Sequence, residues 1–350
     1  MSRGGTGTER RRLAAILLAL GASALVGCTS DSVPFLPTPT PTPEPRPSAD
    51  TVPIPIGFAP LRGTLADPAA LQHPSIGVKI DDHEEARPQI ALNRSDVVFE
   101  ELVEGGLTRY AVVWHSDVPD EVGPVRSIRP MDPDILTPFG GPVAYSGGQE
   151  VFVEMMMATG LPNLVFDYDD TGLFHRADER PGPHDVILKA AEAVSRYPTL
   201  APPPAMFAFG STDPLADPRF AAAPTSHIDL VFSDARFPSW EWSATDRAWL
   251  RSQEGAPDTE ASGDRVRAAN VVTMRVAIDW SYGDVPKTVL TGTGEAWVSA
   301  NGRTAHGTWS KADMPSPIVL TADDGSPLLT APGNTWIELV PDDGSVAFTP

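Results

Sequence analysis

The chain has 350 residues, 41% of them hydrophobic, which is enough to build more than one hydrophobic core. Its formal net charge of −20 at pH 7 repels nucleic acids and anionic lipid headgroups, which argues against either as a general partner. The single cysteine excludes a disulfide framework and a thiolate metal cluster, because each needs at least two sulfur atoms.

The N-terminus has the pattern of a lipoprotein signal peptide. Four arginines precede an apolar run over residues 13–26, which is shorter than the roughly 20 residues of a bilayer-spanning helix. The run ends in Leu25-Val26-Gly27-Cys28, which resembles a bacterial lipobox. We expect residues 1–27 to be removed and Cys28 to carry the lipid that holds the protein at the extracytoplasmic face of the cell membrane. The alternative is an ordinary buried cysteine.

Residues 28–60 are predicted to be a linker. Proline occupies nearly every second position between residues 34 and 60, which fixes φ and favours the extended polyproline II conformation. At about 3.1 Å per residue, residues 29–55 of this linker could reach roughly 80 Å. We expect it to hold the folded part away from the membrane, at the depth of cell-wall polymer.

Residues 61–198 begin with three runs typical of β-strands. Residues 75–80 form the first, and residues 97–103 and 110–114 form the next two. The short Gly105-Gly106 link between the last two predicts an antiparallel hairpin.

Helical patterns follow in the same segment. A helix is predicted over residues 149–158, with a strand over residues 164–166. Another helix is predicted to begin near Asp185, whose carboxylate would cap it, and to end before Pro198. Because strands and helices do not alternate regularly, we predict a mixed α/β domain over residues 61–198 and an α+β fold overall.

A second linker over residues 199–224 precedes a segment, residues 225–350, that is predicted to be a mostly antiparallel β domain. Short apolar runs separated by turns indicate seven or eight strands up to residue 341, and Asn301-Gly302 predicts a type I′ hairpin. Seven tryptophans in this segment either pack in its core, which we expect, or form a sugar-stacking surface. They are Trp240, Trp242, Trp249, Trp280, Trp297, Trp309 and Trp336.

Six arginines of the first domain are candidates for binding an anion. The planar guanidinium group binds a carboxylate or phosphate through paired hydrogen bonds, so several that converge would form an anion pocket. The alternative is that internal carboxylates such as Asp96, Glu100, Glu101 and Glu104 neutralise them. The six are Arg87, Arg109, Arg126, Arg129, Arg176 and Arg180.

Acidic residues and histidines leave three catalytic or metal-binding alternatives open. The run Asp81-Asp82-His83-Glu84-Glu85, with His175 or His184, has oxygen and nitrogen ligands for a divalent metal, but no recognised ligand spacing, so we predict neither metal nor cofactor. A serine hydrolase would use Ser127 or Ser146 with His184 and Asp185, without a Gly-x-Ser-x-Gly elbow. A glycosidase would use Glu101 and Glu104, or Glu150 and Glu154.

Several motifs carry a resemblance to a known family. In the first domain they are Ile80-Asp81-Asp82-His83, Ala86-Arg87-Pro88-Gln89, Ser95-Asp96-Val97-Val98, Gly123-Pro124-Val125-Arg126-Ser127-Ile128-Arg129 and Pro183-His184; in the second, Gly292-Thr293-Gly294-Glu295 and Pro332-Gly333-Asn334-Thr335-Trp336-Ile337. With them the chain resembles the YerB-like bacterial lipoproteins. The resemblance implies an envelope lipoprotein with two domains of unknown function. Asp82 and Asp185 stand where the family pattern has amides, and they add negative charge beside the arginines.

These features predict a non-catalytic binding or adaptor protein of the cell envelope that recognises an anionic wall component or a partner protein. Arg126 and Arg129 would bind the anion, Arg109 and Arg176 would flank it, and His184 would orient it. The alternatives are a cell-wall hydrolase or modifying enzyme that uses Asp81, His83, Glu101 and His184, and a scaffold that acts through the tryptophan-rich domain.

Overall fold

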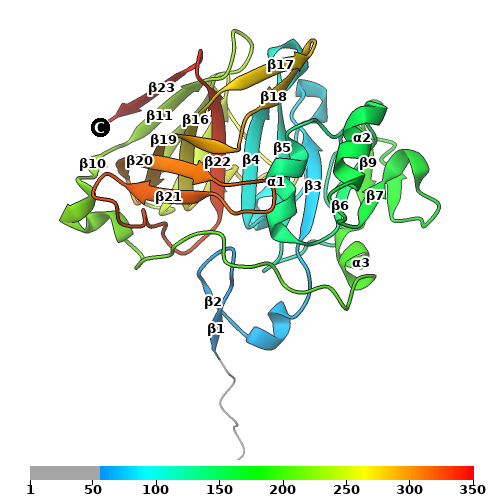
Figure 1. Cartoon of the computed structure of the whole chain (residues 1–350), viewed down its shortest axis with the longest axis horizontal. Coiled ribbons are helices and arrows are strands. Elements are labelled where there is room, and N and C mark those ends of the chain that lie inside the picture. Colours follow the sequence, from blue (N-terminus) through cyan, green and yellow to red (C-terminus); the bar gives the residue numbers. More distant parts are fainter. Residues whose placement is uncertain (1–55) are drawn as a thin grey trace, which may run out of the picture. The chain divides into compact units, whose positions relative to one another are not determined.

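A mixed sheet of eleven strands runs through the computed structural model, which describes residues 56–350 (Figure 1). Parallel and antiparallel pairs both occur in it, and with few helices beside the sheets the predicted α+β fold is confirmed. In spatial order the strands are β10 (Ala223–Pro224), β20 (Arg303–Lys311), β19 (Gly292–Ala300), β16 (Asn270–Val276), β22 (Thr335–Pro341), β4 (Val97–Leu102), β5 (Thr108–Trp114), β3 (Ile76–Asp81), β6 (Val143–Tyr145) and β7 (Asn163–Val165), with β21 (Val319–Ala322) paired to β20.

A second sheet, of six antiparallel strands, is formed within residues 227–349. Its strands in spatial order are β14 (Ala256–Pro257), β13 (Ala248–Gln253), β12 (Pro238–Ser243), β11 (His227–Val231) and β23 (Ser345–Thr349), with β15 (Arg267–Ala268) paired to β13. The two-stranded sheets pair β1 (Gly57–Phe58) with β2 (Leu65–Ala66), β8 (Phe174–Arg176) with β9 (Val186–Leu188), and β17 (Ile278–Tyr282) with β18 (Val285–Thr288). The α-helices of the described residues are α1 (Asp132–Leu136), α2 (Glu150–Met157) and α3 (Ala190–Ser195).

The central sheet joins the two halves of the sequence. Strand β22 lies between β16 and β4 and runs parallel to both, pairing Thr335 with Val97 and Glu338 with Glu100. The segments expected as two domains, residues 61–198 and 225–350, therefore both contribute strands to one sheet.

Each face of this sheet is covered by its own hydrophobic core. Along β4, Val97 and Phe99 belong to one core, which includes residues of helices α1 and α2. Val98 belongs to the other core, which includes residues of α3 and of the six-stranded sheet. Because successive side chains of a strand point to opposite faces, the three consecutive apolar residues at the start of β4 contact both layers.

Both predicted hairpins are confirmed. Strands β4 and β5 pair from Val97↔Val113 to Leu102↔Thr108 around a turn in which Gly105 and Gly106 have φ of 72° and 73°. Asn301 and Gly302, with φ of 50° and 70°, connect β19 to β20. Positive φ at both central residues is what a type I′ turn requires, and glycine and asparagine adopt it most readily.

The helix predicted from Asp185 begins too early. Residues Val186–Leu188 form strand β9, and only Ala190–Ser195 are helical. Three consecutive apolar side chains fit a short buried strand as well as one face of a helix, and here β8 and the segment at Val122 and Val125 supply the hydrogen-bond partners. Asp185 does not cap the helix, since its carboxylate accepts a hydrogen bond from Arg176 at 2.6 Å.

The number of strands predicted for the second half was too low. Between residues 225 and 341 the structure has twelve, β11 to β22, which include the two-residue strands β14 and β15 and the short strands β17, β18 and β21 of four or five residues. The expected core role of the tryptophans is confirmed for most of them: Trp240, Trp249, Trp309 and Trp336 are buried, Trp242 and Trp297 are half-buried, and Trp280 is exposed.

No helix within residues 56–350 has both the length and the apolar character needed to cross a membrane. The predicted signal peptide, Cys28 and nearly all of the proline-rich linker lie outside the described residues.

A buried arginine connects the layers where β4 meets β22. Arg251 of the six-stranded sheet forms 2.6 Å ion pairs with Glu100 and Asp258, and its guanidinium lies over the rings of Tyr110 and Trp336. Glu338 lies beside Glu100, and burial together with that neighbouring charge raises the pKa of Glu338 well above its ordinary value. Glu338 accepts a hydrogen bond from Trp240 at 2.7 Å.

We predict that Arg251→Met lowers the free energy of unfolding by about 3–5 kcal/mol, because it leaves the buried carboxylates of Glu100 and Asp258 without a counter-ion. Denaturant titration measures this change. The control is Arg94→Met, which breaks the exposed pair with Asp117 and should cost no more than about 1 kcal/mol. Equal effects of the two substitutions would contradict the structural role assigned to Arg251.

Candidate functional site

A pocket of about 130 Å³ lies where β3 ends and β5 begins. Its lining combines three arginines, two histidines and two carboxylates with three less polar residues. The lining residues are Asp81, His83, Val103, Glu104, Leu107, Thr108, Arg109, Arg126, Arg129 and His184. Six of the ten residues predicted as a binding site are therefore brought together: Asp81, His83, Arg109, Arg126, Arg129 and His184.

Strand pairing places the first members of the pocket. Arg109 of β5 is paired with Asp81 of β3 on one side and with Glu101 of β4 on the other. The backbone N–H of Arg126 donates to the carbonyl of Lys79 at 2.8 Å, which holds the following segment against β3. Glu104 comes from the single-turn 3-10 helix Glu104–Gly106, which connects β4 to β5.

Asp81 organises the histidine side of the pocket. Its Oδ2 lies 2.7 Å from Nδ1 of His184 and 3.2 Å from Nε of Arg126. Its Oδ1 accepts the backbone N–H of His83 at 3.1 Å. Because an ionised carboxylate only accepts hydrogen bonds, Nδ1 of His184 is the donor. The lone pair of the neutral imidazole is then on Nε2, which lies 3.5 Å from Oε2 of Glu85.

Arg129 is paired with a carboxylate of the pocket. Its Nε donates to Oε2 of Glu104 at 2.6 Å, and its Nη1 donates to the carbonyl of Ile128 at 2.8 Å. Burial opposes ionisation of Glu104, but the hydrogen bond and charge of Arg129 outweigh it and hold the pKa of Glu104 below its ordinary value. Glu104 therefore stays ionised and neutralises Arg129.

Arg109 differs from both neighbours. Its Nη1 donates to the carbonyl of Ser127 at 3.1 Å, and within residues 56–350 no carboxylate oxygen lies within 4.0 Å of its guanidinium nitrogens. Burial and the positive charge of Arg129 lower the pKa of Arg109 to about 9. The pocket thus contains a cation that lacks a direct counter-ion.

Four predicted site residues lie outside the pocket lining. Glu101 is fully buried against Lys79, which also binds Asp132. Arg87 binds Asp82 at 2.8 Å, Arg176 binds Asp185 at 2.6 Å, and Arg180 donates to the carbonyls of Ala86 and Pro88.

Several of the candidate arginines are thus neutralised by carboxylates within the protein, which was the alternative to anion binding. Most of these carboxylates are not the four that were named for this role. Among the four carboxylates named for it, only Glu104 pairs with a candidate arginine. Glu100 binds Arg251, Glu101 binds Lys79, and Asp96 lies 3.8 Å from Arg62.

The two aspartates that differ from the family pattern do not add free negative charge to the pocket. Asp82 is fully buried, and its carboxylate accepts hydrogen bonds from Arg87, Thr108 and Tyr110. Burial opposes its ionisation, but the charge of Arg87 and further arginines holds the pKa of Asp82 below its ordinary value. The charge of Asp185 is matched by Arg176.

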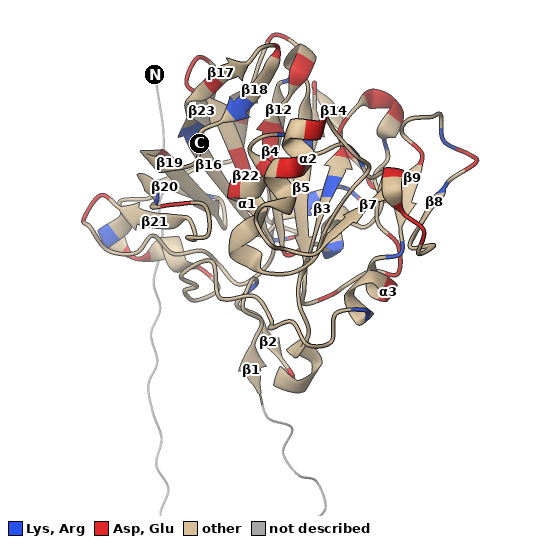
Figure 2. Ribbon diagram, turned by 45° about the vertical axis from the view of Figure 1, so that its right-hand side comes forward, with Lys and Arg blue, Asp and Glu red and all other residues tan. Residues whose placement is uncertain are grey.

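The serine-hydrolase and glycosidase sets are not arranged as those reactions require. Asp185 binds Arg176 rather than His184, and Ser127 Oγ lies 3.4 Å from Ser146 Oγ, so the set of Ser127 or Ser146, His184 and Asp185 forms no triad. Of the residues named for a cell-wall hydrolase or modifying enzyme, Asp81, His83 and His184 line the pocket and Glu101 does not. Glu101 is buried against Lys79, while Glu150 and Glu154 are exposed on helix α2. Figure 2 shows these acidic positions on α2 and basic segments close to β3, at the centre of the fold.

Two acidic residues of the pocket region were not among the ten predicted binding residues. Glu104 was named as an internal counter-ion and as one carboxylate of a glycosidase pair, and Glu85 as part of the acidic run in the metal-binding alternative. The sequence could have placed Glu104 near the pocket, because Glu104 comes directly before the Gly105-Gly106 turn. That turn lies at the same end of the strands as Asp81. No sequence signal places Glu85 near His184, since the two are joined only by tertiary structure.

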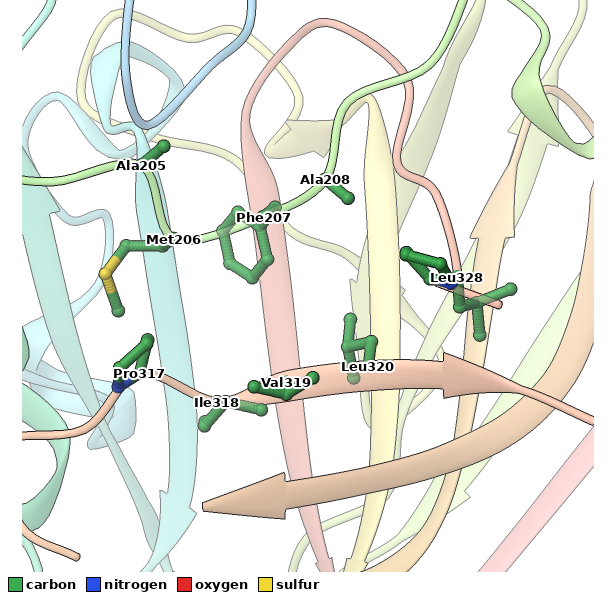
Figure 3. Close-up of a pocket in the computed structure, with 10 residues that line it drawn as sticks. Ala205, Met206, Phe207, Ala208, Pro317, Ile318, Val319, Leu320 and Leu328 are labelled. Atoms are coloured by element: carbon green, nitrogen blue, oxygen red, sulfur yellow. The ribbon is translucent and has the colours of Figure 1, made fainter. Parts of the chain in front are cut away.

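A larger apolar pocket of about 290 Å³ lies elsewhere on the protein, between the segment 205–208 and strand β21. Figure 3 shows Met206 and Phe207 pointing toward the strand that carries Val319 and Leu320. Its lining has no charged side chain, so it has no group for acid–base, metal or anion chemistry. The pocket at Asp81 and Arg109 is the candidate functional site because it brings together six of the ten predicted binding residues.

Comparisons with known proteins agree with the fold and the motifs. Residues 61–200 match the N-terminal domain, and residues 228–337 the C-terminal domain, of the family described as "Protein of unknown function (DUF3048)". A Bacillus subtilis (strain 168) protein described as "Putative lipoprotein YerB" is 26% identical over 298 residues, covering 81% of this chain and 86% of that protein. The crystal structure of the YerB protein from Bacillus subtilis has a TM-score of 0.72 at 22% identity, covering 83% of this chain and 99% of that chain. The expected resemblance to YerB-like proteins is confirmed.

We predict that the neutral side chain of His184 is the Nδ1–H tautomer. The carboxylate of Asp81 requires a donor at Nδ1, whereas a free imidazole favours Nε2–H. Long-range ¹H–¹⁵N correlation NMR of the imidazole distinguishes the two tautomers. In Asp81→Ala the population should move toward Nε2–H, and an unchanged spectrum would contradict the assigned hydrogen bond.

Proposed function

The chain belongs to the DUF3048 family of proteins of unknown function, and we propose that it is a lipid-anchored, extracytoplasmic binding or adaptor protein whose pocket holds an anionic group. The ligand is an anionic cell-wall component or a partner protein that presents a phosphate or carboxylate. The lipid anchor is Cys28, and the proline-rich linker carries the folded part toward its ligand.

The observation that carries this proposal is the unpaired guanidinium of Arg109. Arg126 and Arg129 have carboxylate partners at 3.2 Å and 2.6 Å, whereas Arg109 has a neutral carbonyl. Leaving a partly buried charge without a counter-ion is unfavourable, and an anion in the pocket would relieve it. A planar guanidinium can bind a carboxylate or phosphate through two hydrogen bonds.

The size of the pocket limits what it can hold. Its volume of about 130 Å³ is below the roughly 300–1,000 Å³ typical of pockets that enclose a drug-sized ligand. It therefore accommodates one charged group, such as the phosphate of a wall polymer or a terminal carboxylate, while the rest of the ligand lies on the surrounding surface.

The lipid anchor is supported by the lipobox pattern and by the lipoprotein name of the relative from Bacillus subtilis. We predict that Cys28→Ser prevents lipid attachment and cleavage before residue 28, because the serine hydroxyl cannot form the thioether. Metabolic labelling with a fatty acid and membrane fractionation measure the effect. A variant that remains processed and membrane-bound would contradict the anchor.

We predict that Arg109→Ala weakens binding of phenyl phosphate to the full chain by roughly 10- to 100-fold, because one or two charge-assisted hydrogen bonds worth about 1.5–3 kcal/mol are lost. Isothermal titration calorimetry gives the affinity, and co-sedimentation with purified cell-wall sacculi tests the wall as its source. Arg94→Ala is the matched control, because Arg94 is half-exposed and paired with Asp117. Glu104→Gln should instead tighten binding, since it removes a negative charge and releases Arg129.

Three outcomes decide between the alternatives. Equal affinity of wild type and Arg109→Ala would overturn the pocket as the binding site. Release of soluble fragments from the sacculi would replace the binding function with that of a cell-wall hydrolase. Binding to a partner protein in place of sacculi, with the same dependence on Arg109, would retain the pocket and identify the anion as part of that protein.

A further inference from the structure

We infer that the histidine side of this pocket is a divalent-metal site, formed by His83, Glu85 and His184 and best suited to Zn²⁺. The anion of the proposed function would occupy the remaining coordination position. Only this second part rests on the proposed function, because the three ligands need no anion to bind a metal.

The three side chains converge although His184 is far from His83 and Glu85 in the sequence. One ligand atom from each of His83, Glu85 and His184 lies within 4.8 Å of the other two. The imidazole rings of His83 and His184 are stacked, with centroids 4.6 Å apart and an interplanar angle of 16°. His83 and Glu85 are held near each other by the 3-10 turn η2 (Glu84–Ala86), for which His83 is the N-terminal cap.

His184 is arranged as metal-binding histidines commonly are. Its Nδ1 donates to the carboxylate of Asp81, which fixes the orientation of the ring and makes Nε2 the available ligand. His184 is only 5% exposed, and its Nε2 has no hydrogen-bond donor among the described residues. Oε2 of Glu85 lies 3.5 Å from Nε2, so a cation bound between these two atoms would have a ligand atom from each residue.

His83 must release one hydrogen bond to join the site. Its Nδ1 accepts the backbone N–H of Glu85 at 3.2 Å. A histidine that ligates through Nε2 has its proton on Nδ1, so the cap bond is lost on metal binding. This is a single neutral hydrogen bond at the periphery of the fold, and the gain from metal–imidazole ligation exceeds it.

The neighbouring arginines do not prevent a cation from binding. Arg126 is matched by Asp81 and Arg129 by Glu104, so their charges are balanced within the pocket. Only Arg109 lacks a carboxylate, and it lines the same pocket as His83 and His184. A phosphate or carboxylate that binds both Arg109 and the metal therefore has a cation at each end.

The ligand set selects the metal. Two imidazole nitrogens and one carboxylate oxygen are a common three-residue set for Zn²⁺, which leaves a fourth position open to water or an anion. Ca²⁺ and Mg²⁺ prefer sites made of oxygen ligands, and this site offers only one carboxylate.

The test is titration of Zn²⁺ into the full chain after removal of metals with a chelator, followed by isothermal titration calorimetry. Wild type should bind one Zn²⁺ per chain, and His184→Ala, His83→Ala and Glu85→Gln should each weaken binding at least about tenfold. His175→Ala is the control, because His175 is half-buried beside Glu121 and lies outside the pocket. Absence of binding, or unchanged affinity in His184→Ala and Glu85→Gln, would overturn the metal site.

Two further measurements distinguish failure of the metal site from failure of the proposed function. Glu85 has a side chain that is 62% exposed, so Glu85→Gln should retain the circular dichroism spectrum and melting temperature of wild type, and its loss of Zn²⁺ then reports the site. Phenyl phosphate should bind at least severalfold more tightly with Zn²⁺ present than without it. Zn²⁺ binding without any phosphate binding would overturn the proposed function and leave the metal site, whereas phosphate binding that depends on Arg109 but not on Zn²⁺ would overturn the coupling.

Discussion

The parallel pairing of β22 with β4 is the constraint on which the rest of the structure depends. It places a strand from the end of the chain beside a strand from its first third, with Glu338 next to Glu100. The two acidic residues are adjacent there, where Arg251 of the second sheet pairs with Glu100 and where burial and the charge of Glu100 raise the pKa of Glu338. The ion pair of Arg251 with Glu100 thus links the two sheets at this point.

The candidate site is a consequence of this arrangement. Strands β3, β4 and β5 are held in register by the apolar residues that contact both cores, and their register fixes Asp81, Arg109 and Glu101 in one row across the sheet. Within this row, Glu101 is buried and neutralised by Lys79, whereas Asp81 and Arg109 line the pocket. The charged groups therefore lie at the ends of interior strands of the sheet, and binding sites on strands are positioned more precisely than sites on loops.

The electrostatics of the pocket are local and differ from those of the whole chain. The protein has a net charge of −20, yet the lining of the pocket contains three arginines and only two carboxylates. At an ionic strength of about 0.15 M, charges more than roughly 8 Å apart in solvent are largely screened, so the distant acidic surface affects the approach of an anion more than its binding. In the proposed function, selectivity would come instead from Arg109, Asp81 and His184, whose side chains are held by hydrogen bonds.

The sequence by itself determined the local structure and the residue types of the site. The glycine pair at 105–106 and Asn301-Gly302 specify their hairpins because few other residues adopt positive φ, and the motifs around Asp81, Arg126 and Arg129 identified most of the pocket. Tertiary structure alone decided the pairing of β22 with β4, the strand at Val186–Leu188, and which arginines keep a free guanidinium. The physical reason is that these outcomes depend on partners distant in sequence: Val186 becomes a strand because Val125 offers a hydrogen-bond partner, and Arg109 remains unpaired because Glu101 is taken by Lys79.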